Sequence, residues 1–245
     1  MNVLGRVCEL VRYPVKSMAG VPTESAFLGW HGLEGDRRFA FRRLGDESDF
    51  PWLSASRLPE LLLYRPVLLD PGAGHPPPTH ARTPAGTDLE IRGDELRLEI
   101  SERLGSGVEL MQLRNGIFDD APVSVISLAT IAGIGQKAGM ELDRRRFRAN
   151  ILLESHDREP FLEDRWVGGS LVFGDRETGA AVSVTARDVR CMMINLDPGT
   201  AAQDARVLKA VAGLNQNNAG VYGTVVRTGT IRVGDPVRLV PDATG

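Results

Sequence analysis

Short apolar runs separated by turn residues dominate the chain. Residues 3–11 set Leu4, Val7 and Leu10 among small and polar positions, and Tyr13-Pro14 ends the run. Residues 38–42 alternate polar and apolar side chains, which is the pattern of a half-buried strand. Similar runs predict further strands at 60–69, 88–100, 151–154, 166–173, 181–186, 220–227, 230–233 and 237–240.

Two segments have the pattern of helices instead. Ser127 can cap a helix that runs to about residue 137, and Gly139 can end it. A second helix is predicted over residues 201–214. Residues 70–86 are rich in Pro, Gly and His and predict a loop that could act as a flexible flap.

Many short strands with few helices are typical of barrels and sandwiches rather than βαβ units. We therefore expect a mainly β fold with a few helices (α+β). The polar segment 112–120 is the best candidate boundary, which predicts one domain over residues 1–115 and another over 116–245.

Composition narrows the class of protein. The formal net charge is −3, and no basic cluster of the size that nucleic acid or an anionic membrane would need accompanies it. No apolar run approaches the roughly 20 residues of a membrane helix, and the first residues do not resemble a signal peptide. These features favour a cytoplasmic protein with neither a nucleic-acid nor a membrane partner.

The chain has two cysteines, too few for a disulfide scaffold, a zinc ribbon or a cysteine-ligated iron–sulfur cluster. Cys8 lies within an alternating strand and is interpreted as a small buried hydrophobe. Cys191 follows Arg190, whose guanidinium would favour the thiolate that binds metals or attacks electrophiles. Asp197-Pro198 begins a turn a few residues later.

Several polar residues could bind an anion. Lys16 and Ser17 follow the first strand in a loop, and their side chains are donors suited to a phosphate. Arg37 opens the next strand, where a guanidinium that points inward needs an anionic partner. Within the protein itself, Asp36 is the candidate for this partner.

Two later segments add donors of the same kind. Arg148 and Asn150 share a strand face at a spacing of two residues and could clamp a phosphate or the edge of a heterocycle, although a cluster of arginines is usually solvated. Tyr222 lies in a glycine-flanked strand whose backbone can be approached closely.

Other chemistries lack their motifs. The histidines have no ligand spacing, which argues against a zinc enzyme, and neither a dinucleotide loop, a P-loop nor a G-x-S-x-G elbow occurs. A soft metal held by one sulfur would need its other ligands from a large anionic cofactor.

Five separated motifs resemble a known family. The first motif, VCELVRYPVKSMAGVP together with GLEGDRRFAF, is similar to the N-terminal β-barrel domain that precedes MOSC (molybdenum cofactor sulfurase C-terminal) domains. The other four motifs resemble the MOSC domain itself: RFRANILLE, EDRWVGGSLVFGD, RDVRCMMINLDPGT, and GVYGTVV with GTIRVGDPVRLV. The resemblance implies two β-barrel-like domains with a molybdopterin in the cleft between them. It extends to bacterial reductases of N-hydroxylated bases and to the mitochondrial amidoxime-reducing component.

The resemblance also assigns roles to residues. It makes Cys191 the thiolate ligand of molybdenum and a catalytic residue, and we expect Asp197 to orient a proton donor. The residues that would contact the cofactor are Lys16, Ser17, Arg37, Ser127, Arg148, Asn150, Arg190 and Tyr222. Val189 stands where a relative has serine and Ala149 where proline is common. The loop after Asp197 also departs from the family pattern. These departures bear on the substrate preference inferred from the family more than on the binding of the cofactor.

The resemblance implies a molybdenum-dependent oxidoreductase that reduces N-hydroxylated or N-oxide compounds. No ferredoxin-like domain follows, so electrons are expected from a separate ferredoxin- or flavin-type reductase. Two alternatives remain open: a sulfur-transfer enzyme or carrier with a persulfide on Cys191, and a non-catalytic molybdopterin carrier.

Overall fold

The computed structural model describes residues 3–68, 79–174 and 178–241, so most of the predicted flap lies outside the described residues. Its strands are β1 (Val3–Arg12), β2 (Val21–Thr23), β3 (Ser25–Gly29), β4 (Gly32–Leu33), β5 (Phe39–Arg43), β6 (Arg65–Val67), β7 (His80–Arg82), β8 (Asp88–Glu90), β9 (Val108–Gln112), β10 (Val123–Ser127), β11 (Ile151–Ser155), β12 (Gly169–Phe173), β13 (Ala181–Val189), β14 (Asn218–Arg227), β15 (Gly229–Arg232) and β16 (Pro236–Pro241). The helices are α1 (Asp94–Leu104), α2 (Leu128–Ala138) and α3 (Arg206–Asn215), with short 3-10 helices η1 (Pro59–Leu63), η2 (Arg144–Phe147), η3 (Leu162–Trp166) and η4 (Met192–Asn195). The prediction of a mainly β fold with a few helices is confirmed.

Seven strands close into a barrel. Their order is β11-β10-β14-β13-β12-β16-β1, and β1 pairs back onto β11 to complete the circle. Neighbours are antiparallel except β10 and β11, which run parallel. Side chains such as Val7, Leu171 and Val221 fill the interior and are at most 1 % exposed. Closure leaves these seven strands without a free edge between them.

Strand β13 bends where it approaches its end. Its register with β14 shifts between Val184 and Ala186 and again between Arg187 and Val189. Such bulges bend a strand and redirect its side chains, and they are common beside functional sites. The shifts therefore set the direction in which the residues before Cys191 leave the barrel.

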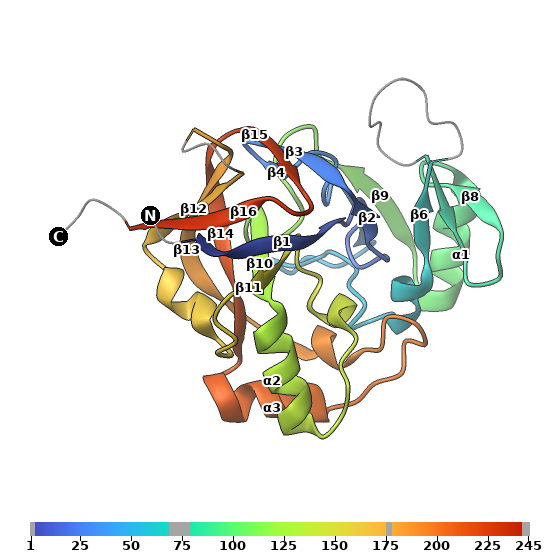
Figure 1. Cartoon of the computed structure of the whole chain (residues 1–245). Helices are drawn as coiled ribbons and strands as arrows, with labels where there is room; N and C mark the ends of the chain where they lie inside the picture. Colours follow the sequence, from blue (N-terminus) through green and yellow to red (C-terminus); the bar gives the residue numbers. More distant parts are fainter. Residues whose placement is uncertain (1–2, 69–78, 175–177, 242–245) are drawn as a thin grey trace.

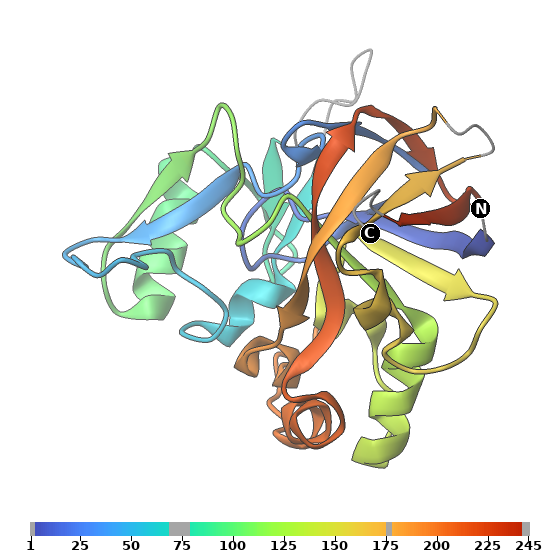
Figure 2. The ribbon, with the colours of Figure 1, turned by 90° about the vertical axis from the view of Figure 1, so that its left-hand side faces the viewer.

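Strand β2 pairs with β1 at the side of the barrel, and the other described strands form small sheets of two or three strands: β15-β3-β4, β5-β9 and β6-β7-β8. The last two stand with α1 in a smaller lobe beside the barrel (Figures 1 and 2). This lobe has its own buried core, which includes Phe39, Leu61 and Ile100. Leu196, which follows Cys191 much later in the sequence, belongs to the same core, so the segment after Cys191 is held against the smaller lobe.

Helices α2 and α3 lie side by side at one end of the barrel (Figure 1). The prediction of both ends of α2 is confirmed: the Ser127 hydroxyl accepts a hydrogen bond from the Thr130 backbone N–H, and Gly139 ends the helix in the left-handed region at φ 69°. Ile131 and Val211 from the two helices pack into a third buried cluster.

Three strand or helix predictions are wrong in part. Residues 60–69 form the 3-10 helix η1 and the short strand β6, and 88–100 form β8 followed by α1. In α1, Leu96 and Ile100 are four residues apart and both buried, a spacing that puts two side chains on one face of a helix as well as on one face of a strand. The second predicted helix begins only at Arg206, because the 197–204 segment is folded around Asp197.

The proposed boundary between residues 115 and 116 stays a prediction. Strand β1, from the first part of the chain, pairs with β11 and β16 and closes the barrel. Among the described residues, no helix is long and apolar enough to cross a membrane.

Candidate functional site

A cleft of about 290 Å³ lies where the barrel meets the loops that follow β1, precede β5 and follow β13. Seven of the residues singled out in the sequence line it, although they come from segments more than 200 positions apart: Lys16, Ser17, Arg37, Arg148, Arg190, Cys191 and Tyr222. Asp197, Ser127 and Asn150 are not among its lining residues.

Cys191 stands two residues after the end of β13, at the residue that precedes η4. Its side chain is exposed, in contrast to that of Cys8, which is half-buried and donates its thiol to the Leu152 carbonyl at 3.3 Å. Burial raises the pKa of Cys8 to about 11, so this thiol is an inert one. Of the two thiols, only that of Cys191 belongs to a residue that lines the cleft.

The side chain of Arg190 turns into the protein rather than toward the thiol beside it. Its Nε and Nη1 donate to the carbonyl oxygens of Ala219 and Phe147, each at 2.7 Å. Its Nη2 lies 2.8 Å from an oxygen of Asp188. These two buried atoms attract each other as charges, but neither makes a hydrogen bond with any described residue, so both keep hydrogen-bonding capacity.

Asp188 is a site residue that the sequence analysis did not single out. It is 1 % exposed and lines the cleft three residues before Cys191. Burial raises its pKa to about 6, although the Arg190 charge acts against this shift. The signal was present in the RDVRC motif, where a carboxylate near the end of a barrel strand has to be paired or neutralised if it is buried.

Arg37 holds several segments of the cleft together. Its guanidinium pairs with Asp36 and Asp119 and donates to the Arg148 carbonyl and to the Asn150 side-chain oxygen. Asp36 is thus the partner expected for an inward guanidinium. Despite its burial, the pKa of Asp119 is held below its usual value by the positive charges of Arg37 and Lys16.

Asn150 is fully buried behind this cluster. Its side-chain oxygen accepts from the Ser124 backbone N–H at 3.1 Å, and its amide donates to the Val11 carbonyl at 3.2 Å. These bonds tie β10 and β1 to the residue that precedes β11. The prediction that Arg148 and Asn150 share a strand face is wrong, because both precede β11 and Arg148 ends η2 in the left-handed region. Asn150 therefore supports Arg37 from within the fold and does not itself line the cleft.

Arg148 differs from the other arginines of the cleft. Its Nη1 donates to the Met18 carbonyl at 2.7 Å, and its guanidinium lies 4.3 Å from the ring centre of Tyr13. Within the described ranges it forms no ion pair with a carboxylate. Burial, with the nearby Arg37 charge, lowers the pKa of Arg148 to about 10, which leaves a protonated cation without an anionic partner in the described part of the chain.

The backbone of this wall is held in a conformation that non-glycine residues rarely adopt. Ser17, Arg37 and Arg148 have φ of 66°, 44° and 51°. Each such residue costs on the order of 1–3 kcal/mol, and such residues cluster at ligand sites. Lys16, next to Ser17, donates to the Phe118 carbonyl at 2.8 Å, and burial lowers its pKa.

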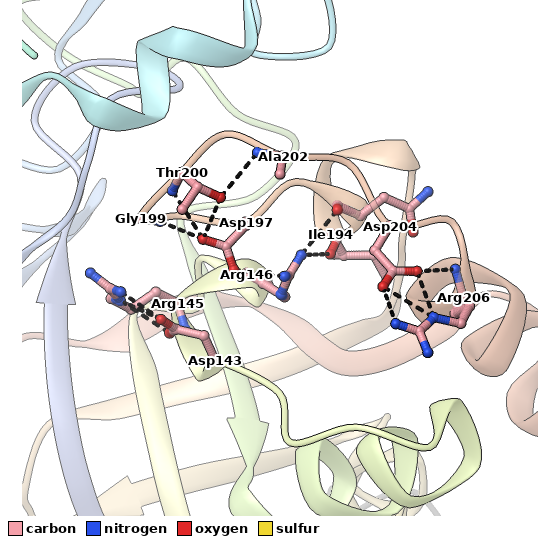
Figure 3. Close-up of polar contacts among 11 residues, drawn as sticks. Asp143, Arg145, Arg146, Ile194, Asp197, Gly199, Thr200, Ala202, Asp204 and Arg206 are labelled. Carbon is pink, nitrogen blue, oxygen red and sulfur yellow. Dashed lines mark hydrogen bonds and ion pairs between the residues drawn. The ribbon is translucent and has the colours of Figure 1, made fainter.

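Asp197 closes a loop beside the cleft (Figure 3). One oxygen accepts from the Gly199 and Thr200 backbone N–H groups, and the other lies 2.8 Å from Arg146 Nη2. Burial works against it, yet these hydrogen bonds hold the pKa of Asp197 below its usual value. A carboxylate engaged in this way fixes the loop, and the role in catalysis expected from the sequence stays a prediction.

Arg146 is the second site residue that the sequence analysis did not name. It is 6 % exposed, lines the cleft and donates to the carbonyl oxygens of Ile194 and Asn195 (Figure 3). It thereby fastens η2 to the segment that begins at Cys191. The run of arginines at 144–148 carried the signal, but a basic cluster does not show which of its members turns inward.

Ser127 lies at the start of α2, away from the cleft. Its hydroxyl contacts Thr130 and donates to Glu163 at 3.0 Å, and all three residues are fully buried. Its contact with a cofactor, expected from the resemblance, stays a prediction.

The fold and the cleft define a member of a family. A model of the MOSC domain matches residues 111–238, and the chain belongs to that family.

Two curated relatives give the family a narrower context. The chain is 30 % identical over 137 residues to "Mitochondrial amidoxime reducing component 2" of Rattus norvegicus, a match that covers 51 % of this chain and 38 % of that protein. It is 26 % identical over 135 residues to "Mitochondrial amidoxime-reducing component 1" of Homo sapiens, over 50 % of this chain and 38 % of the relative. The matched region is thus well under half of either relative.

A solved structure supports the fold over nearly the whole chain. The YUAD protein from Bacillus subtilis has a TM-score of 0.51 at 15 % identity, with 96 % of this chain and 94 % of that chain covered. At this identity the likeness shows the fold alone.

Proposed function

We propose that the protein is a molybdenum-cofactor-binding oxidoreductase that reduces N-hydroxylated or N-oxide compounds. The observation that carries the proposal is the meeting in one cleft of a MOSC-family protein of Cys191 with Arg148, a cation that pairs with no carboxylate of the described residues. The substrate class rests on the names of the relatives, which are amidoxime-reducing components.

The charges of the cleft fit an anionic, phosphate-bearing cofactor. Five cationic residues line it, namely Lys16, Arg37, Arg146, Arg148 and Arg190, against the three carboxylates Asp119, Asp120 and Asp188. The excess of cations stands in a chain whose formal net charge is −3. A pterin phosphate would supply the missing anion for Arg148.

Among the described residues that line the cleft, Cys191 offers a thiol to a metal. Within the described residues, no group of three or more His, Cys, Asp or Glu side chains gathers to hold a metal ion. A soft metal bound to Cys191 would therefore take its remaining ligands from the cofactor. When bound, the molybdenum cofactor supplies two-electron oxygen-atom chemistry to such a site.

The residues of this chain would then divide the work. Cys191 would hold the metal, and Lys16 and Ser17 would bind the phosphate end of the cofactor. Asp188 has a pKa of about 6 because of its burial, so its carboxyl can hold or release a proton near neutral pH. Electrons would come from a separate ferredoxin- or flavin-type protein in the cytoplasm.

The proposal is tested by the molybdenum content of the protein, made in a host that synthesises the cofactor. The wild type should carry about one molybdenum per chain, and Cys191→Ser should lose it. Cys8→Ser is the matched control, because that thiol is held by Leu152 inside the fold and should leave the metal in place.

Two outcomes would contradict the proposal. Metal-free wild type with a cyanide-labile sulfur on Cys191 would indicate a sulfur carrier. Bound molybdenum that no reductant and no N-hydroxylated compound can cycle would indicate a carrier of the cofactor.

A further inference from the structure

A second cavity of about 360 Å³ adjoins the cleft. The two share Lys16, Phe50, Asp119 and Asp120, whereas Cys191 belongs only to the first. The rest of the second cavity is lined by Trp52, Met111, Gln112, Leu113, Ile117 and Phe118. These residues come from the end of β9, from the segment that follows it and from the segment after β5, so the smaller lobe supplies most of the wall.

The wall is apolar and partly aromatic. The rings of Trp52 and Phe118 meet edge to face with their centres 4.7 Å apart, and Phe118 is 6 % exposed, so this corner is rigid. Phe50 and Met111 are 49 % and 37 % exposed, although both line the cavity. Apolar surface left open beside a cleft is suited to a planar apolar group of a ligand.

The charged rim where the two cavities meet favours a cation or a donor of hydrogen bonds. The charged residues that line the second cavity are Lys16, Asp119 and Asp120. Lys16 already donates to the Phe118 carbonyl, and Asp119 is paired with Arg37. Asp120 is exposed, and within the described ranges no ion pair engages its carboxylate.

We propose that this second cavity binds an aromatic group of the substrate, and that Asp119 and Asp120 accept N–H donors of the attached amidine-type group. The substrate's reacting end would then lie in the part of the cleft that contains Cys191. The binding site stands on the cavity alone, and only its description as a substrate site rests on the proposed function. The chemical class is an aromatic compound with a cationic or N–H-rich nitrogen group.

Trp52 provides a readout that does not depend on catalysis. The chain has three tryptophans; Trp30 is exposed and can be replaced by phenylalanine, and Trp166 is 2 % exposed and out of reach of a small molecule. In the full chain carrying Trp30→Phe, prepared with and without the cofactor, benzamidine should quench Trp52 fluorescence. Its dissociation constant should be about tenfold lower than that of acetamidine, which lacks the ring. Calorimetry on the same samples checks both constants.

Two variants and a probe of opposite charge examine the proposed contacts. Met111→Ser and Asp120→Asn should each weaken benzamidine binding about threefold. The matched controls Leu98→Ser and Glu102→Gln, on exposed positions of α1, should leave it unchanged. Benzoate, which has the same ring and a carboxylate, should bind more weakly than benzamidine.

The proposal is overturned if benzamidine and acetamidine bind alike, if benzoate binds as tightly as benzamidine, or if both cavity variants bind like the controls. These results are separable from those for the proposed function. Ring-selective binding in a protein that never carries molybdenum would refute the reductase and keep the binding site. A molybdenum-loaded reductase without ring-selective binding would refute this inference alone.

Discussion

At the scale of single residues, the buried carboxyl of Asp188 makes stability depend on pH. Its ordinary pKa is 3.8 and burial raises it to about 6, so folding favours the protonated form. Its stabilising contribution is fully present below about pH 3.8 and is lost as the pH rises through 6. The shift corresponds to roughly 3 kcal/mol in the free energy of unfolding.

Asp188→Asn removes this titration. In protein without cofactor, the variant should gain stability relative to wild type as the pH rises from 4 to 7.5, by up to about 3 kcal/mol. Chemical denaturation at several pH values measures the difference, with Glu102→Gln on the exposed face of α1 as control. A difference in the free energy of unfolding that stays constant over this pH range would show that folding does not raise the pKa of Asp188.

At the scale of elements, Ser127 has a structural role at the start of α2, and a substitution there can distinguish this role from binding of the cofactor. The hydroxyl accepts from the Thr130 N–H and donates to the buried carboxyl of Glu163. Ser127→Ala should therefore lower the free energy of unfolding by about 1–3 kcal/mol. It should leave molybdenum content unchanged, whereas a serine that binds cofactor would lose metal when replaced. Ser106→Ala, at an exposed position after α1, is the control.

The helices also show which structural elements could be predicted from the sequence. The caps of α2 were predictable because Ser127 and Gly139 act through local backbone geometry. The helix α1 was not, because its apolar residues fit both periods in so short a stretch.

The candidate site divides in the same way. All four residues Cys191, Arg148, Asp188 and Arg146 stand in motifs that resemble those of the family. The motifs do not show that Asp188 and Arg146 are buried at the cleft, because their burial and the bonds of Arg146 depend on distant segments. Such long-range contacts leave no periodic pattern in the sequence.

At the scale of the whole molecule, the two ends of the sequence depend on each other. The family model begins at residue 111, yet the barrel is closed by β1, which pairs with β11 on one side and β16 on the other. Val7 and Leu10 of β1 are at most 1 % exposed within the barrel core. Without β1, two strand edges would be left open and this apolar surface would lose its cover.

Residues 111–245 expressed alone should therefore fail to unfold cooperatively and should bind a hydrophobic dye, because the barrel cannot close. Adding a peptide of residues 1–33, which supplies β1 together with β3 and its pairing to β15, should restore a sharp thermal transition. The same peptide with Val7 and Leu10 replaced by serine is the control and should not restore it. A cooperative transition for residues 111–245 alone would instead support an independent domain that begins near residue 116, and would mean that β1 is an addition to a barrel already stable without it.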